Sequence, residues 1–243
     1  MKKLSILFAV FLLSSACSPV AASATINPAL NVVPSAQVPG PAVNTTVPTA
    51  SAPTQSPSLT KEEQDDLLFM REEEKLAHDV YTALSQKWNM NIFGNISQSE
   101  TTHTNEVITL LTAYQVSDPA AALPAGQFSI PELQALYTQL VTRGSQSLAA
   151  ALKVGAAIEE MDIRDLKARL LSTDKTDIRL VYENLLQGSY NHLRSFVSVL
   201  QQQTGEVYTP QYLTAEEYQQ IINASAGNSV GGQGRGGSYG RSR

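Results

Sequence analysis

Residues 60–88 read TKEEQDDLLFMREEEKLAHDVYTALSQKW, and this stretch decides the fold. Apolar residues recur in it at the spacing of one helical face, at Leu67, Met70, Ala77, Tyr81 and Leu84. Thr60 followed three residues later by Glu63 is the capping-box pattern that begins a helix. The stretch therefore predicts a helix that ends near residue 88, with Glu74 on its apolar face and Glu72 pointing away from that face.

The same periodicity continues along the chain. It predicts further helices over residues 96–114, 129–144, 145–171, 176–204 and 214–223. Polar segments, or segments with proline and glycine, separate them, and none offers the period-two alternation of a strand. The expected fold is all-α: an antiparallel four-helix bundle with a short extra helix between the two hairpins and a C-terminal bracing helix.

The start of the chain resembles an export signal over residues 1–17. Two lysines precede an apolar run at residues 4–13 that is too short to span a bilayer. Residues 13–17, LSSAC, are similar to a bacterial lipobox with Cys17 as the lipidated residue, and Ala22-Ser23-Ala24 offers an ordinary signal-peptidase site instead. We expect an exported protein of the bacterial cell envelope or periplasm, anchored to the membrane if Cys17 is lipidated.

Two segments of biased composition flank the predicted domain. Residues 18–58 hold no charged residue and many Ala, Pro, Ser, Thr and Val, and they are expected to form a disordered tether. Residues 224–243 are rich in Gly, Ser and Arg and are expected to form a disordered tail. Residues 59–223 are long enough for one domain with a core. Export and a net charge of −5 argue against nucleic acid as a partner.

Acidic residues and histidines fall on the apolar faces of the four long predicted helices. They are Glu74, Glu100, His103, Glu159, Asp162 and His192. Burying an unpaired carboxylate costs several kcal/mol, so a packed bundle tolerates this set only where its members pair or bind a cation. Glu100 and His103 share one helical turn, the spacing with which Glu-x-x-His serves a dinuclear metal site.

Other polar residues are expected close to these candidate ligands, and the tyrosines among them could donate hydrogen bonds or electrons. They are Glu73, His78, Tyr81, Tyr114, Glu160, Tyr182 and Ser189. His78 lies at the border of its helical face and is either a partner of the ligands or exposed. Ser189 stands three residues before His192, where the pattern of the second helix has a glutamate.

The arrangement resembles the ferritin-like superfamily of di-iron carboxylate proteins. Three stretches, MREEEKLA at 70–77, IEEMDI at 158–163 and GSYNHL at 188–193, are similar to a bacterial ferritin-like group known as domain of unknown function 2202. The resemblance covers residues 60–205. It implies iron, either as two ions with Asp162 replacing the carboxylate that Ser189 does not supply, or as one ion without that replacement. Imidazole and carboxylate ligands also suit manganese or zinc.

Three hypotheses for function follow. The first is a ferritin-like metal-binding protein that oxidises ferrous iron or reduces peroxide or oxygen, with Glu100 as a bridging ligand. The second is a non-catalytic helical module in which Glu74 pairs with His192 and Glu159 pairs with His103. The third is a metal chaperone or sensor that binds its ion reversibly. The sequence does not fix the oligomeric state.

Overall fold

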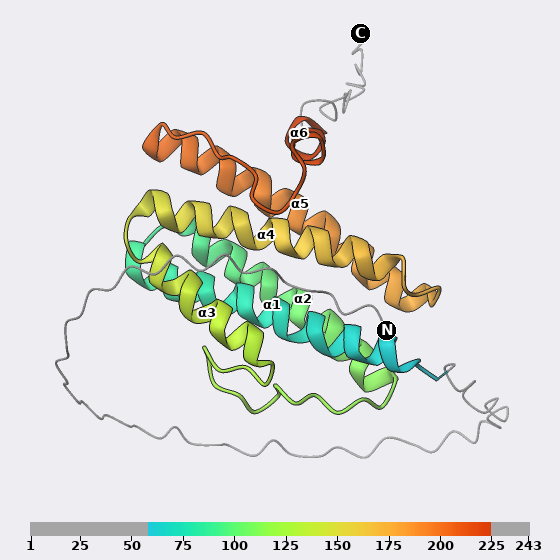
Figure 1. Ribbon diagram of the computed structural model, residues 1–243. Coiled ribbons are helices and arrows are strands. Elements are labelled where there is room, and N and C mark those ends of the chain that lie inside the picture. The colour runs from blue at the N-terminus through green and yellow to red at the C-terminus, as the bar shows by residue number, and fades with distance from the viewer. Residues whose placement is uncertain (1–57, 225–243) are drawn as a thin grey trace, which may run out of the picture. The chain divides into compact units, whose positions relative to one another are not determined.

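The computed structural model describes residues 58–224, and these fold into six helices (Figure 1). The helices are α1 (Lys61–Trp88), α2 (Asn91–Ala113), α3 (Pro131–Gly144), α4 (Leu148–Leu170), α5 (Thr176–Thr204) and α6 (Ala215–Asn223). No residue within the described range forms a strand. The all-α prediction is confirmed. The predicted export signal, Cys17, all but the last residue of the tether and all but the first residue of the tail lie outside the described residues.

Two helical hairpins pack together to form the bundle. Short connections make α1 antiparallel to α2 and α4 antiparallel to α5, and each of these pairs is in extensive contact. The hairpins meet where α1 faces α4 and α2 faces α5. Helix α3, in the crossover between the hairpins, lies against α1 and α4, and α6 lies against α5 (Figure 1). This is the predicted bundle with its extra helix and its C-terminal brace.

The ends of α1 follow from local chemistry, whereas the start of α2 does not. Thr60 and Glu63 form the predicted capping box, and Asn89 ends α1 in the left-handed conformation with φ of +49°. Helix α2 begins at Asn91, five residues before the predicted start. The burial of Phe93, whose ring centroid lies 5.8 Å from that of Phe196, outweighs the poor helix propensity of the Asn- and Gly-containing segment.

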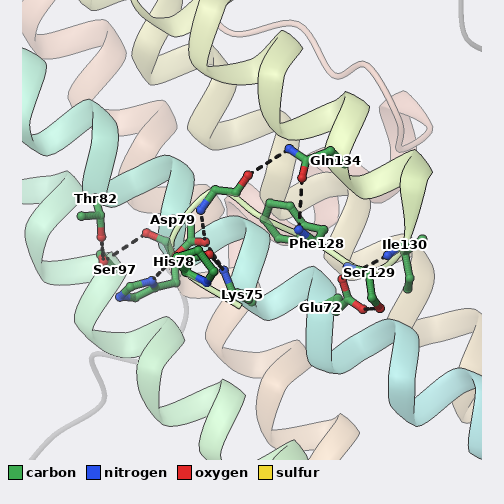
Figure 2. Close-up of polar contacts among 12 residues, drawn as sticks. Glu72, Lys75, His78, Asp79, Thr82, Ser97, Phe128, Ser129, Ile130 and Gln134 are labelled. Carbon is green, nitrogen blue, oxygen red and sulfur yellow. Dashed lines mark hydrogen bonds and ion pairs between the residues drawn. The ribbon is translucent and has the colours of Figure 1, made fainter. Parts of the chain in front are cut away.

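The three consecutive glutamates of α1 are all buried, although Glu72 was predicted to point away from the apolar face. The carboxylate of Glu72 accepts hydrogen bonds from the backbone N–H of Ser129 at 2.7 Å and of Ile130 at 3.3 Å, and also from the Ser129 hydroxyl (Figure 2). These N–H groups immediately precede α3, so a negative charge there is favourable. The side of α1 that points away from the bundle core is thus covered by the crossover.

Asp79 holds the crossover against α1. Its carboxylate accepts hydrogen bonds from Lys75 Nζ at 2.5 Å and from the backbone N–H of Gly126 at 2.8 Å (Figure 2). His78 Nδ1 lies 2.9 Å from the same carboxylate. Burial alone would raise the pKa of Asp79, but the contacts with His78, Lys75 and Gly126 hold this pKa below its ordinary value. His78 therefore belongs to this network.

Candidate metal centre

The four long helices each direct a carboxylate or an imidazole into the centre of the bundle. Helix α1 supplies Glu74, α2 supplies Glu100 and His103, α4 supplies Glu159, and α5 supplies His192. The three carboxylates are 0–1% exposed, whereas the two imidazoles are 8% and 9% exposed. The imidazoles therefore lie closest to solvent, at the side where α2 meets α5.

Glu100 lies between the two imidazoles. Its Oε2 is 2.7 Å from His103 Nδ1, and its Oε1 is 2.8 Å from His192 Nδ1. The two imidazole rings are stacked, with centroids 5.5 Å apart and an interplanar angle of 28°. Each oxygen of this one carboxylate thus faces a different histidine, which is the arrangement required of a ligand that bridges two ions.

The remaining carboxylates complete two groups that share Glu100. Glu74 Oε2 lies 3.3 Å from His103 Nδ1, and Glu159 Oε2 lies 3.5 Å from His192 Nδ1. We call Glu74, Glu100 and His103 the first half-site, and Glu100, Glu159 and His192 the second half-site. Within each, one candidate ligand atom per residue lies within 4.8 Å of the others. The pairing predicted for a metal-free core, Glu74 with His192 and Glu159 with His103, is wrong. Glu74 instead faces His103, and Glu159 faces His192.

The electrostatics of the cluster follow from burial opposed by these close contacts. Burial would lower the pKa of both histidines, but Glu100 and Glu74 raise that of His103 to about 11, and Glu159 and Glu100 raise that of His192 to about 10. Burial would raise the pKa of Glu100, yet the two imidazoles lower it to about 2. Burial raises the pKa of Glu74 to about 7, and the charge of Glu100 adds to this rise.

Several buried atoms of the cluster have no hydrogen-bond partner among the described residues. They are Glu74 Oε1, both oxygens of Glu100, Glu159 Oε2, both oxygens of Asp162, and His192 Nδ1. The short contacts between Glu100 and the imidazoles are therefore not aligned as hydrogen bonds. Orphaned atoms of this kind are costly in a core, and their convergence fits cation ligation.

Two further contacts orient candidate ligands of the second half-site. The Tyr81 hydroxyl donates to Glu159 Oε1 at 2.5 Å and reaches the carbonyl of Gly155 at 3.3 Å. His192 Nε2 lies 3.1 Å from Ser99 Oγ, which leaves Nδ1 facing the carboxylates. Such contacts fix the orientation of a ligand. Tyr81 was predicted to lie near the ligands, whereas Ser99 was not considered.

Asp162 and Ser189 lie in the core without completing either half-site. Asp162 is 1% exposed, and burial together with the negative charges of Glu74 and Glu73 raises its pKa well above the ordinary value. The Ser189 hydroxyl donates to the carbonyl of Leu185 at 3.1 Å. Helix α5 therefore supplies one imidazole to the cluster, and Asp162 adds a fourth buried carboxyl close to the other three.

Two residues predicted to lie near the ligands are engaged elsewhere. Glu160 accepts hydrogen bonds from the backbone N–H groups of Gln211 and Tyr212, both at 2.7 Å, and thereby holds the connection between α5 and α6. The Tyr114 hydroxyl donates to the carboxylate of Asp177 and ties the end of α2 to the start of α5. Both side chains therefore form hydrogen bonds with segments that are distant in the sequence and adjacent only in the folded protein.

The other predicted neighbours are also separate from the half-sites. His78 contacts Asp79. Glu73 interacts with Asp165 and Arg169 of α4, and burial, with the charge of Asp165, raises its pKa well above the ordinary value. The buried Tyr182 hydroxyl has no partner among the described residues, and burial raises its pKa. Of the seven predicted neighbours, Tyr81 is the one with a hydrogen bond to a ligand carboxylate.

Residues 63–225 match the family model described as an uncharacterized protein domain, DUF2202. The chain belongs to the DUF2202 family. This confirms the narrower of the two resemblances found in the sequence, and the wider ferritin-like resemblance stays a prediction.

A relative of known structure extends the comparison. The chain is 49% identical over 167 residues to uncharacterized protein MJ0754 of Methanocaldococcus jannaschii, which covers 69% of this chain and 90% of the relative. The crystal structure of hypothetical protein MJ0754 superposes with a TM-score of 0.67 at 48% identity, over 72% of this chain and 98% of that one.

The relative also corrects one prediction about location. The placement at a bacterial cell envelope is wrong, because the relative MJ0754 comes from an archaeon, which has no bacterial envelope. The sequence features on which that placement rested lie outside residues 58–224. No helix of the described range combines the length and apolarity needed to cross a lipid bilayer.

Proposed function

We propose that this DUF2202 domain binds two divalent metal ions in the bundle core and acts as a redox centre, with iron as the preferred metal. The observation that carries the proposal is the sharing of Glu100 between the two half-sites, with one oxygen facing each histidine. Glu74 and His103 would hold one ion, and Glu159 and His192 would hold the other. Bound iron would supply redox chemistry, in which electrons pass to oxygen or peroxide and, for a ferrous-iron oxidase, come from ferrous iron as the substrate.

The charge of the core supports two ions. Four carboxyl groups are buried together, from Glu74, Glu100, Glu159 and Asp162. When both histidines are neutral and all four carboxyls are ionised, the charge of the cluster matches that of two divalent cations. Asp162 would contribute through this balance even where it makes no bond to metal. A buried charge of this size has no comparable compensation in the metal-free protein unless protons supply it.

The donor types support a metal of intermediate softness. Imidazole nitrogen with carboxylate oxygen suits iron, manganese or zinc, and the half-sites contain no thiolate. The contact of Ser99 with His192 and the hydrogen bond from Tyr81 to Glu159 would fix two ligands of the second half-site. The donor set alone accommodates all three metals. We prefer iron because of the resemblance to ferritin-like proteins.

The contacts of His192 also resemble a hydrolase triad, and the structure disfavours this alternative. Ser99 Oγ, His192 and Glu100 follow one another at 3.1 Å and 2.8 Å. However, Ser99 lies inside α2, where backbone N–H groups bond to the preceding helical turn. These N–H groups cannot stabilise an oxyanion beside the hydroxyl. The contact is better explained as one that orients His192.

A non-catalytic paired core is the second candidate function. It is favoured by the two raised histidine pKa values, since protonated imidazoles next to carboxylates form a self-consistent set without metal. Under this hypothesis, adding metal leaves the melting temperature unchanged. A reversible chaperone or sensor would use the same half-sites and differs from the redox centre in lacking turnover.

The proposal is tested by loading the full chain with Fe(II) in air and measuring bound iron and the absorption spectrum together. Two irons per chain, with near-ultraviolet absorption of an iron pair, are expected. One tightly held ion would reduce the proposal to a single half-site. The same loading is repeated with Mn(II) and Zn(II). If no metal binds above background, the proposal is overturned.

A variant pair completes this test. The double variant E100A/H103A should lose stoichiometric metal, because it removes the bridge and one histidine. H78A is the matched control, since His78 contacts Asp79 and not the cluster, and it should bind metal like the unchanged protein. Far-ultraviolet circular dichroism shows whether each variant keeps its helices. Retained stoichiometric binding in a folded E100A/H103A protein would overturn the proposal.

A further inference from the structure

We infer that Gly188 of α5 is a positioning residue for His103, and that it determines whether the first half-site can form; this inference rests on the proposed metal site. A Cβ atom at residue 188 would lie 2.5 Å from both Cε1 and Nε2 of His103. Carbon atoms in proteins do not approach so closely. The His103 ring therefore lies directly against the backbone of α5, in space that any other residue would fill.

The ring cannot step aside without leaving its ligands. His103 Nδ1 lies 2.7 Å from Glu100 Oε2 and 3.3 Å from Glu74 Oε2. The stacked ring of His192 occupies the adjacent space, with its centroid 5.5 Å away. A methyl group at residue 188 would thus push the imidazole away from α5 and displace Nδ1 from its place between the two carboxylates.

The contact has a counterpart on the opposite helix. His192 reaches across from α5 to α2, where its Nε2 meets Ser99 Oγ at 3.1 Å. Ser99 precedes His103 by four residues, and Gly188 precedes His192 by four residues. Each histidine therefore packs against the residue one turn before the other histidine. A small residue at this position on both helices is what allows the two imidazoles to cross.

The two contacts differ in chemistry, which makes Gly188 testable on its own. Ser99 offers His192 a hydroxyl, whereas Gly188 offers His103 only room. Alanine also favours helix more than glycine does. A metal defect in G188A would therefore not come from a weakened α5, but from the displaced ring.

The test is a Co(II) titration of the full chain followed by calorimetry and visible absorption. The unchanged protein should take up two equivalents. G188A should take up one equivalent strongly and bind the second roughly 10–100-fold more weakly, the usual effect of disturbing a contact that orients a ligand. The matched control is G144A at the end of α3, where the added Cβ would lie 2.7 Å from Leu84 Cδ2. It should bind two equivalents.

Double variants identify the half-site that is lost. G188A/E74A should bind like either single variant, because both changes act on the first half-site. G188A/E159A should lose both strong equivalents, because the changes act on different half-sites. Two equivalents of unchanged affinity in G188A would overturn the inference and leave the metal site intact. Absence of binding by the unchanged protein would overturn the proposed function itself.

Discussion

Metal binding at this centre should release protons, so the affinity for a divalent ion should rise with pH. In the metal-free protein the pKa of His103 is about 11 and that of His192 is about 10, so both imidazoles are protonated near pH 7. A protonated imidazole cannot be a ligand. Each ion must therefore displace a proton from the histidine of its own half-site.

The size of this pH effect follows from the difference between each histidine pKa and the pH of the measurement. At pH 7, removing the proton costs about 4 kcal/mol at His192 and about 5 kcal/mol at His103, at 1.36 kcal/mol per pKa unit. This cost falls by about 1.4 kcal/mol for each unit by which the pH rises. The affinity of each half-site should thus rise about tenfold per pH unit between pH 7 and pH 9. Below pH 7 the slope of the first half-site should steepen, because Glu74, with a pKa of about 7, also becomes protonated.

Zn(II), which has no redox chemistry, is the suitable probe. Its affinity is measured by competition with a chromophoric chelator across this pH range, and the protons released are counted by calorimetry in two buffers of different ionisation enthalpy. About one proton per ion is expected from the histidines. H192A is the control: it should hold one ion and, above pH 8 where Glu74 is ionised, release about one proton in total. An affinity that does not change with pH would refute the reasoning.

Three other outcomes are expected. Without metal, the protonated forms of His103 and His192 stabilise the fold fully below pH 6.5, and this contribution is lost as the pH rises toward 10 for His192 and 11 for His103. Melting temperatures recorded in the presence of chelator should therefore fall as the pH rises over that interval. A melting temperature that does not change with pH would contradict this expectation. Y81F removes the hydrogen bond to Glu159 and should cost roughly 1.5–3 kcal/mol in urea unfolding, with weaker metal binding at the second half-site; unchanged values for both would argue against this role. E160A leaves two backbone N–H groups unpaired and should cost roughly 1–3 kcal/mol and expose the connection before α6 to proteases, whereas a loss of bound metal would contradict the separation of Glu160 from the centre.

The helices with strong local signals were predicted well from the sequence. Helix α1 has a capping box at one end and a regular apolar face, and its predicted and observed limits agree. The start of α2 was placed too late, because Gly94 and its polar neighbours suggested a loop. What makes this segment helical is the contact of Phe93 with Phe196, more than 100 residues away in the chain, and no local pattern records that contact.

The candidate ligands were predictable for a physical reason. A carboxylate or imidazole on the apolar face of a bundle helix must lie in the core, so helical phase alone brings Glu74, Glu100, His103, Glu159 and His192 together. Whether they bind metal stays a prediction. Their neighbours were harder to predict, because phase does not tell which other segment covers a helix. Glu160 and Tyr114 illustrate this, since each is bonded to a residue at least 50 positions away.

The residues that hold the histidines were missed for another reason. Ser99 and Gly188 carry no charge and sit beside residues that attracted attention, and the resemblance to known families emphasised the ligands. Yet the chain contains the signal twice, as a small residue four positions before His103 and again before His192. This spacing is a pattern to look for wherever two imidazoles on facing helices are expected to cross.

If metal binds as proposed, the sharing of Glu100 would also set the order in which the two half-sites form. The α1–α2 hairpin contains the whole of the first half-site, whereas the α4–α5 hairpin contributes Glu159 and His192 and depends on Glu100 from its neighbour. One ion could therefore be captured by half of the fold before the other half docks. The second ion would then link the two hairpins, and its loss would weaken the contact between them without unfolding either hairpin.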